Sequence, residues 1–146
     1  MLIDGLTNAG AMPSLELTMR FAAQRQRLIA HNVANIDTPD FQHRDVSTER
    51  FQETLADAVD RRRAKTGGRF GELDWQPTRE LSKGSRGELW IEPRGSVGGV
   101  LSHDRNDRDL ERTLQDLAET AGAFRAASAL YTAQRGVLQN AIAERV

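Results

Sequence analysis

The C-terminal part of the chain carries the pattern that most constrains its fold. From about 107 to 144 there is no proline, and apolar or small side chains recur at alternating steps of four and three residues. This spacing predicts one long helix, roughly 55 Å in length at about 1.5 Å per residue. A compact domain of 146 residues has a radius of gyration of only about 15 Å, so such a helix must project, fold back on a partner helix, or assemble. The predicted heptad row, whose large apolar members are the predicted assembly contacts, is Leu110, Leu114, Leu117, Ala121, Phe124, Ser128, Tyr131, Arg135, Leu138 and Ile142.

This C-terminal helix has more apolar surface than one partner helix can cover. Two glycines, Gly122 and Gly136, lie inside it, and each costs about 1 kcal/mol relative to alanine. They indicate close packing at those positions or a helix that is stable only when assembled. A second apolar stripe lies beside the heptad row and consists of Ala123, Leu130, Val137 and Ala141.

A second long helix is predicted near the N-terminus. Ser14 to Asn35 contains no proline or glycine, and Pro13 stands where a proline favours a helix start. Its apolar residues form two stripes, which implies burial on several sides or contact with another chain. One stripe is Leu15, Met19, Ala22, Ala23, Ile29, Ala30, Val33 and Ile36, and the other is Leu17, Phe21 and Leu28.

The middle of the chain is predicted to be irregular. A short helix is expected over about 50–65, after which eight of the twelve glycines fall between Gly67 and Gly99 and break any long helix. Leu89–Ile91 and Val97–Leu101 are expected to pair as a hairpin, with Trp75 and Trp90 as its anchors. The predicted parts are therefore an N-terminal helix and turn (1–45), a middle segment (46–106) and a C-terminal heptad helix (107–146).

Composition excludes several classes of function. Twenty Lys and Arg face twenty-one Asp and Glu, giving a net charge of −1, which argues against a protein that mainly neutralises phosphates or coats an anionic membrane. The chain has no cysteine, so disulfide and thiolate chemistry are excluded. No segment approaches the roughly 18 apolar residues of a membrane-spanning helix. The N-terminus lacks the basic flank, the apolar core and the small-residue cleavage site that together mark a cleaved signal peptide.

No residue pattern predicts an enzyme, a cofactor or a metal site. His31, His43 and His103 are the only histidines, and none is spaced one helical turn from another as paired metal ligands would be. The common nucleophile, phosphate-loop and zinc-protease motifs do not occur. The basic run Arg61 to Lys65 lacks interleaved aromatic residues, so we interpret it as a solvated helix end rather than a nucleic-acid site.

The most specific string in the sequence follows the N-terminal helix. It reads Ala30-His-Asn-Val-Ala-Asn-Ile-Asp-Thr-Pro-Asp-Phe41. Asn35 is a suitable helix stop, and Pro39 forbids continuation of the helix. The amides of Asn32 and Asn35 lie on the same side of the last turn, where alanine would have higher helix propensity. They either bridge backbone groups of the turn or of an adjacent subunit, or form a local cap.

This string resembles the signature of the rod, hook and filament axial proteins of the bacterial flagellum. That signature is Asn-(Ile/Val)-Ala-Asn, a short spacer, and Thr-Pro-Gly-(Tyr/Phe). The chain departs from it at Asp40, where the family usually has glycine and where a turn depends on a positive φ, which aspartate tolerates better than most residues. The matching residues are Asn32, Val33, Ala34, Asn35, Thr38, Pro39 and Phe41.

Within that family the chain is most similar to the proximal rod members. The supporting residues are Ala23-Gln24-Arg25-Gln26 before the signature, Arg44-Asp45-Val46 after it, and Asn106-Asp107 leading into the C-terminal helix. The resemblance covers about 14–60 and 104–144.

The resemblance implies a mainly α-helical structural subunit whose long N- and C-terminal helices pair as a coiled coil, with a short irregular middle segment. Copies of the chain would stack around an export channel and contact other rod proteins, the membrane ring and the export gate. Such subunits leave the cytoplasm unfolded, through the flagellar type III apparatus and without a cleaved signal, to form the periplasm-spanning rod.

Two other classes of protein make different predictions. A soluble coiled-coil adaptor or export chaperone would close the heptad row within a small defined oligomer and would not require Asn32 or Asn35. A nucleic-acid binder would be retained on DNA through Arg61 to Lys65 in a salt-sensitive manner.

Overall fold

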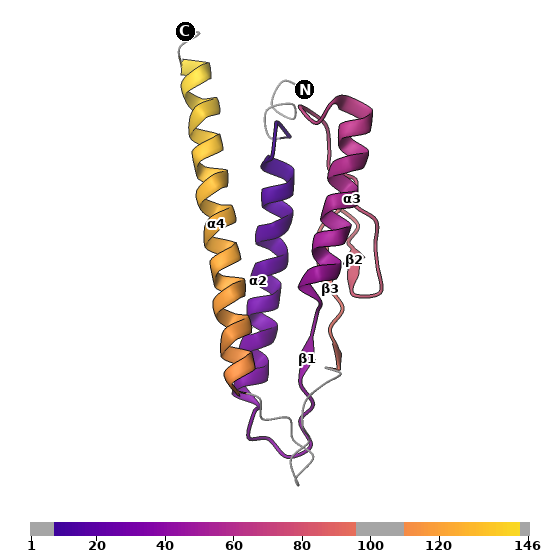
Figure 1. Ribbon diagram of the computed structural model, residues 1–146, viewed down its shortest axis with the longest axis vertical. Coiled ribbons are helices and arrows are strands. Elements are labelled where there is room, and N and C mark those ends of the chain that lie inside the picture. The colour runs from indigo at the N-terminus through magenta and orange to yellow at the C-terminus, as the bar shows by residue number, and fades with distance from the viewer. Residues whose placement is uncertain (1–7, 96–109, 144–146) are drawn as a thin grey trace. The chain divides into compact units, whose positions relative to one another are not determined.

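The computed structural model is mainly helical and describes residues 8–95 and 110–143. Its three described helices are α2 (Met12–Ala34), α3 (Thr48–Thr66) and α4 (Leu110–Ala143) (Figure 1). All three were predicted by apolar periodicity, with ends that differ by a few residues from the expected ones. Between them lie four short strands: β1 (Arg44–Asp45), β2 (Leu81–Lys83), β3 (Leu89–Ile91) and β4 (Arg94–Gly95).

Local signals in the sequence account for the ends of α3. Glu49 lies in its first turn and Arg63 and Lys65 in its last, where they complement the helix dipole. Gly67 follows the helix with φ +67°, and its N–H donates to the carbonyl of Arg63 at 2.9 Å. This left-handed residue satisfies a terminal carbonyl and stops the helix.

The strands form two separate antiparallel pairs, neither of which was predicted from the sequence. β3 pairs with β2 through Leu81↔Ile91 and Lys83↔Leu89, whereas its expected partner, 97–101, lies outside the described residues. The loop of this hairpin closes through Gly87 at φ +81°, as in three-residue hairpin loops that end in a left-handed residue. Arg94 and Gly95, which lie between the two segments expected to pair, form β4, which pairs with β1.

The chain divides into two compact units, and both α2 and α4 contribute to each of them. Unit 1 contains Met1–Met19, Thr48–Gln76 and Phe124–Val146, and unit 2 contains Arg20–Ser47 and Pro77–Ala123. The described core of unit 1 consists of Met12, Leu17, Phe51, Ala58, Trp75 and Ala127, and that of unit 2 of Phe21, Ala22, Leu28, Ile29, Val46, Leu81 and Leu89.

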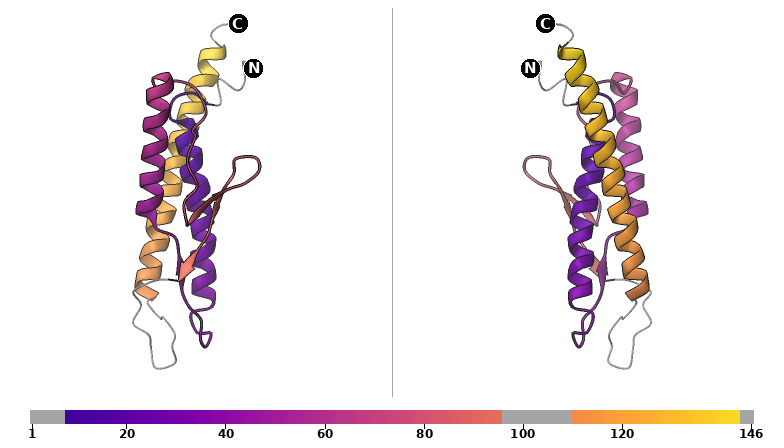
Figure 2. Two further views of the ribbon diagram at one scale, coloured as in Figure 1. Left: turned by 90° about the vertical axis from the view of Figure 1, so that its right-hand side faces the viewer. Right: turned by 90° about the vertical axis from the view of Figure 1, so that its left-hand side faces the viewer.

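The two tryptophans differ in role. Trp75 is 3% exposed and belongs to the core of unit 1, whereas Trp90 is 56% exposed. The expectation that Trp90 anchors the hairpin is therefore wrong. In unit 2, the β2–β3 loop extends away from α2 (Figure 2), and Trp90 lies on the exposed face of this hairpin, opposite Ser82. Within the described ranges, no helix is both long enough and apolar enough to cross a membrane.

Candidate functional site

In unit 2, the inner side of α2 is one broad buried surface rather than two separate apolar stripes. Three rows of residues run along it at a spacing of seven: Phe21 with Leu28, Arg25 with Asn32, and Ala22 with Ile29. All six side chains are at most 9% exposed. The polar row lies between the two apolar rows because the helix repeats about every 3.6 residues. The gap between the predicted stripes is thus filled by buried polar side chains.

Arg25 is the centre of a buried polar cluster formed by Arg25, Asp45, Asp116 and Thr120. Its Nε donates to Oδ1 of Asp45 at 3.1 Å and its Nη2 to Oδ2 at 3.0 Å. Nη2 also donates to Oδ1 of Asp116 at 3.2 Å, and Nη1 to Oγ1 of Thr120 at 2.8 Å. One guanidinium therefore connects α2 to β1 and to the first third of α4, using the planar fork that suits bidentate carboxylate contacts.

The charge of Arg25 is compensated within unit 2. The side chain is 6% exposed, while those of Asp45 and Asp116 are 32% and 25% exposed. Burial lowers the pKa of Arg25, but the hydrogen bonds and negative charges of Asp45 and then Asp116 outweigh it and raise that pKa above its ordinary value. The Arg25 guanidinium is therefore positively charged at neutral pH.

Asn32 fixes the strand that follows the turn. Its Nδ2 donates to the carbonyl of Arg44 at 2.7 Å, and its Oδ1 accepts the N–H of the same residue at 3.3 Å. The side chain is 1% exposed, so a buried amide satisfies both the N–H and the carbonyl of Arg44. Of the alternatives that the sequence left open, the amide of Asn32 thus bridges backbone groups within the same chain, although these belong to the strand after the turn.

Gln24 contacts β3 in the same way. Its Nε2 donates to the carbonyl of Leu89 at 2.5 Å, and its Oε1 accepts the N–H of Ile91 at 3.1 Å. Gln24 and Asn32 thus use primary amides to mimic a neighbouring strand. Both residues belong to the sequence that carries the family resemblance.

The rest of the signature forms an exposed turn. α2 ends at Ala34, and the Nδ2 of Asn35 donates to the carbonyl of His31 at 2.8 Å, which makes Asn35 a local cap. Asp40 has φ 58°, so the left-handed conformation that the family supplies with glycine occurs here with aspartate. The ring of Phe41 packs edge-on against His31, with centroids 5.8 Å apart. Val33 is half-buried, whereas Ala34, Thr38 and Pro39 are exposed.

The structure corrects the predicted heptad row of α4. The buried positions are Thr113, Thr120 and Ala127, at 1%, 4% and 4% exposure. In the predicted row, Leu117, Phe124, Tyr131 and Leu138 are half-buried, whereas Leu110, Leu114 and Ile142 are 45–50% exposed. The second stripe is also exposed, with Leu130 at 59% and Val137 at 68%.

The two glycines of α4 have no close neighbour among the described residues. A Cβ atom added to Gly122 or Gly136 would meet nothing within 4 Å. Of the two reasons that the sequence offers for these glycines, close packing is therefore not found in the described part of this chain.

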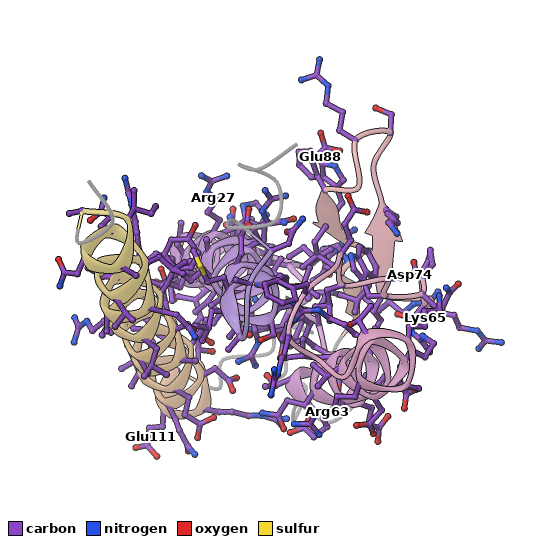
Figure 3. The ribbon with its side chains drawn as sticks, turned by 90° about the horizontal axis from the view of Figure 1, so that it is seen from above. Arg27, Arg63, Lys65, Asp74, Glu88 and Glu111 are labelled. Carbon is purple, nitrogen blue, oxygen red and sulfur yellow. The ribbon has the colours of Figure 1, made fainter. Side chains whose placement is uncertain are left out.

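Unit 1 contains a second buried arginine, which corrects the interpretation of the basic run as wholly solvated. Arg62 is 6% exposed and donates to the carbonyls of Gly10, Asn8 and Phe70 at 2.6, 2.5 and 3.4 Å. It thereby holds the turn before α2 against α3. Arg63 and Lys65, by contrast, are exposed, on different sides of α3 (Figure 3).

An open depression of about 340 Å³ in unit 1 is lined by Ser14 and by side chains of α3, among them Leu55 and Val59. Its charged members, Asp60 and Arg63, approach each other at 3.5 Å and are both largely exposed. Across residues 8–95 and 110–143, no group of three His, Asp or Glu side chains is placed to bind a metal.

Sequence reasoning missed the pairing of Arg25 with Asp45, Asp116 and Thr120. A signal was present, because an arginine and an asparagine seven positions apart lie between two apolar rows of one helix. Such a central position predicts burial, and a buried arginine requires hydrogen-bond acceptors, of which carboxylates are the strongest. Comparison of the chain with protein-family models and with curated proteins finds no match.

Proposed function

We propose that the chain is a structural, non-enzymatic subunit of the bacterial flagellar basal-body rod that polymerises through its terminal helices in the proximal part of the hollow shaft. The signature residues support this proposal, because they belong to one local arrangement. Asn32 binds the backbone of Arg44, and Asp40 adopts the left-handed conformation that the signature requires. The sequence that resembles the axial family thus has a definite structural role.

The observation that carries the proposal is the exposed apolar surface of α4. Leu130 and Val137, two turns apart, are 59% and 68% exposed, and Leu114 is 50% exposed. A helix of 34 residues with large apolar side chains left in water on more than one side is typical of a subunit that meets further helices. In the proposed assembly, α2 and α4 pair as a coiled coil and neighbouring copies cover the remaining surface.

The proposed function implies specific partners and a location for the chain. Copies of the chain stack around an export channel and contact other rod proteins, the membrane ring and the export gate. In this proposal the chain reaches the periplasm-spanning rod unfolded, through the type III export apparatus.

The sharpest test uses α4 residues that the subunit itself does not bury. Leu130→Asp and Val137→Asp are expected to abolish incorporation into the rod and motility, because neighbouring helices would have to bury the new carboxylate. Both side chains are already exposed, so helical circular dichroism of the free chain should change little. Thr132→Asp, at an exposed polar position of the same helix, is the matched control and should assemble.

The outcome also separates the proposed function from its rival. Cells with Leu130→Asp that swim normally and retain the chain in purified basal bodies would contradict the proposal. A small oligomer of fixed size in sedimentation, unaffected by either substitution, would instead identify a soluble coiled-coil adaptor. Leu117→Asp and Phe124→Asp should block incorporation too, but these half-buried side chains also contribute to the subunit's own packing.

A further inference from the structure

The first third of α4 buries two threonines while two leucines remain exposed. Thr113 and Thr120 are 1% and 4% exposed, whereas Leu110 and Leu114 are 45% and 50% exposed. Leu117 lies on the same side of the helix as the two threonines and is half-buried. Burial of a threonine gains less than burial of a leucine, so apolar burial by itself does not account for the inward position of Thr113 and Thr120.

The contacts of Arg25 account for this inward position. Asp116 and Thr120 are four residues apart on α4, so they share one side of the helix, and both accept hydrogen bonds from the Arg25 guanidinium. The other edge of the guanidinium is occupied by both oxygens of Asp45. Asp45 in β1 thus fixes the orientation of the guanidinium. Its remaining N–H donors reach Asp116 and Thr120 in only one rotational position of α4.

Rotation of α4 would leave the cluster incomplete. A turn by one residue is about 100°, which would carry Asp116 and Thr120 away from Arg25. The arginine, 5% exposed, would then retain Asp45 alone, with buried donors left without acceptors.

We propose that Arg25 is the positioning residue that sets the rotation of α4 against α2 in unit 2, so that Thr113 and Thr120 face inward and Leu110 and Leu114 remain on the surface. This applies to the single chain and does not depend on the proposed function. One consequence rests on that function: a buried arginine then decides which leucines the start of α4 presents to a neighbouring copy.

Cysteine labelling measures the rotation directly. Because the full chain has no cysteine of its own, Thr113→Cys and Leu114→Cys give two single-thiol proteins that differ by one helical position. When Arg25 is retained, a soluble maleimide is expected to label the thiol of Leu114→Cys at least about tenfold faster than that of Thr113→Cys. The reason is that a buried thiol reacts only through local opening. When each cysteine is combined with Arg25→Met, the ratio of the two labelling rates should fall to about one or invert.

A second variant separates rotation from simple loss of folding. Asp116→Ala combined with Thr120→Val removes the acceptors on α4 but leaves the pair of Arg25 and Asp45, so the arginine stays compensated. The labelling ratio should collapse here as it does with Arg25→Met. Arg27→Met, at an exposed position of α2 (Figure 3), is the control and should leave the ratio unchanged.

Each outcome decides the proposal. Collapse of the ratio in the double variant, with helical circular dichroism retained, supports it even if Arg25→Met does not fold. A ratio that persists in the double variant overturns it, because α4 then keeps its rotation without Arg25. Equal and fast labelling of both cysteine variants when Arg25 is retained also overturns it, since the free chain would not hold α4 in one rotational position.

Discussion

The two units each contain a buried arginine, but the two side chains are compensated differently. Arg25 in unit 2 meets two carboxylates and a hydroxyl from β1 and α4. Arg62 in unit 1 meets backbone carbonyls of the turn before α2 and of the loop after α3, and none of the ion pairs found among the described residues involves it. Arg25 and Arg62 are buried to about the same degree, at 5% and 6% exposure.

The comparison shows that burial alone does not define what an arginine contributes. Charged acceptors attract a guanidinium more strongly than carbonyl dipoles do. When the guanidinium is removed, the carboxylates are left without a compensating positive charge. Arg25 should therefore determine the arrangement of whole elements, whereas Arg62 should mainly hold one turn in place. The following substitutions test this difference, from the largest expected effect to the smallest.

The largest loss is expected for Arg25→Met. Asp45 and Asp116 would remain near an apolar surface without their cation, so the free energy of unfolding should fall by about 3 kcal/mol. This is the lower end of the usual range because both carboxylates retain some water. Urea denaturation followed by circular dichroism measures the change. The control, Arg27→Met on the exposed side of α2, should lose less than about 0.5 kcal/mol.

The next loss is expected for Asn32→Ala. It removes the buried amide that binds the N–H and carbonyl of Arg44 and should cost about 2 kcal/mol. Asn35→Ala, which removes an exposed local cap, should cost about 1 kcal/mol or less. Equal losses in the two variants would show that the contact of Asn32 with β1 is not what distinguishes these asparagines.

A smaller loss is expected for Arg62→Met, about 1.5 kcal/mol. The carbonyls of Asn8 and Gly10 would lose a donor but could turn to water, since they carry no net charge. Amide hydrogen exchange should rise mainly in unit 1. Arg63→Met, at a side chain that is 69% exposed, is the control. A loss that matches or exceeds that of Arg25→Met would break the distinction between charged and carbonyl acceptors.

The smallest effect is expected for Gln24→Ala. Its amide binds a half-exposed part of β3, so the free energy of unfolding should fall by about 1 kcal/mol or less. The clear signal is local: the Ile91 N–H, which Gln24 Oε1 accepts, should exchange faster, while amides of α3 remain unchanged. Unaltered exchange at Ile91 would mean that β3 is held by β2 alone.

Sequence patterns predicted the helices because periodicity records which face of each helix is buried. The three described helices lie where proline-free apolar repeats place them, and Pro39 and Gly67 mark the points beyond which a helix cannot continue. The β2 strand was missed because Leu81–Lys83 contains a single apolar residue, whereas β3 is the apolar run Leu89-Trp-Ile91. Its signal was the following Gly84-Ser-Arg-Gly87 loop, which suits a tight hairpin.

The inward row of α4 and the role of the signature were harder to predict. Apolar spacing assigned Leu114 to the buried side, but hydrogen bonds from a residue some ninety positions away turn Thr120 inward instead. The position of Arg25 between two apolar rows indicates its burial, but it does not indicate which distant residues accept its hydrogen bonds. The Asn32 amide, in contrast, could be interpreted as a backbone contact because an asparagine is a poor choice for the interior of a helix.

Electron cryomicroscopy of basal bodies, purified from cells that produce the chain, tests the proposed rod function most directly. The account predicts continuous density for α2 and α4 of many copies around the proximal channel, with Leu130 and Val137 covered by neighbouring subunits. A proximal rod built wholly from other proteins, with this chain recovered only as a small oligomer in the soluble fraction, would contradict it.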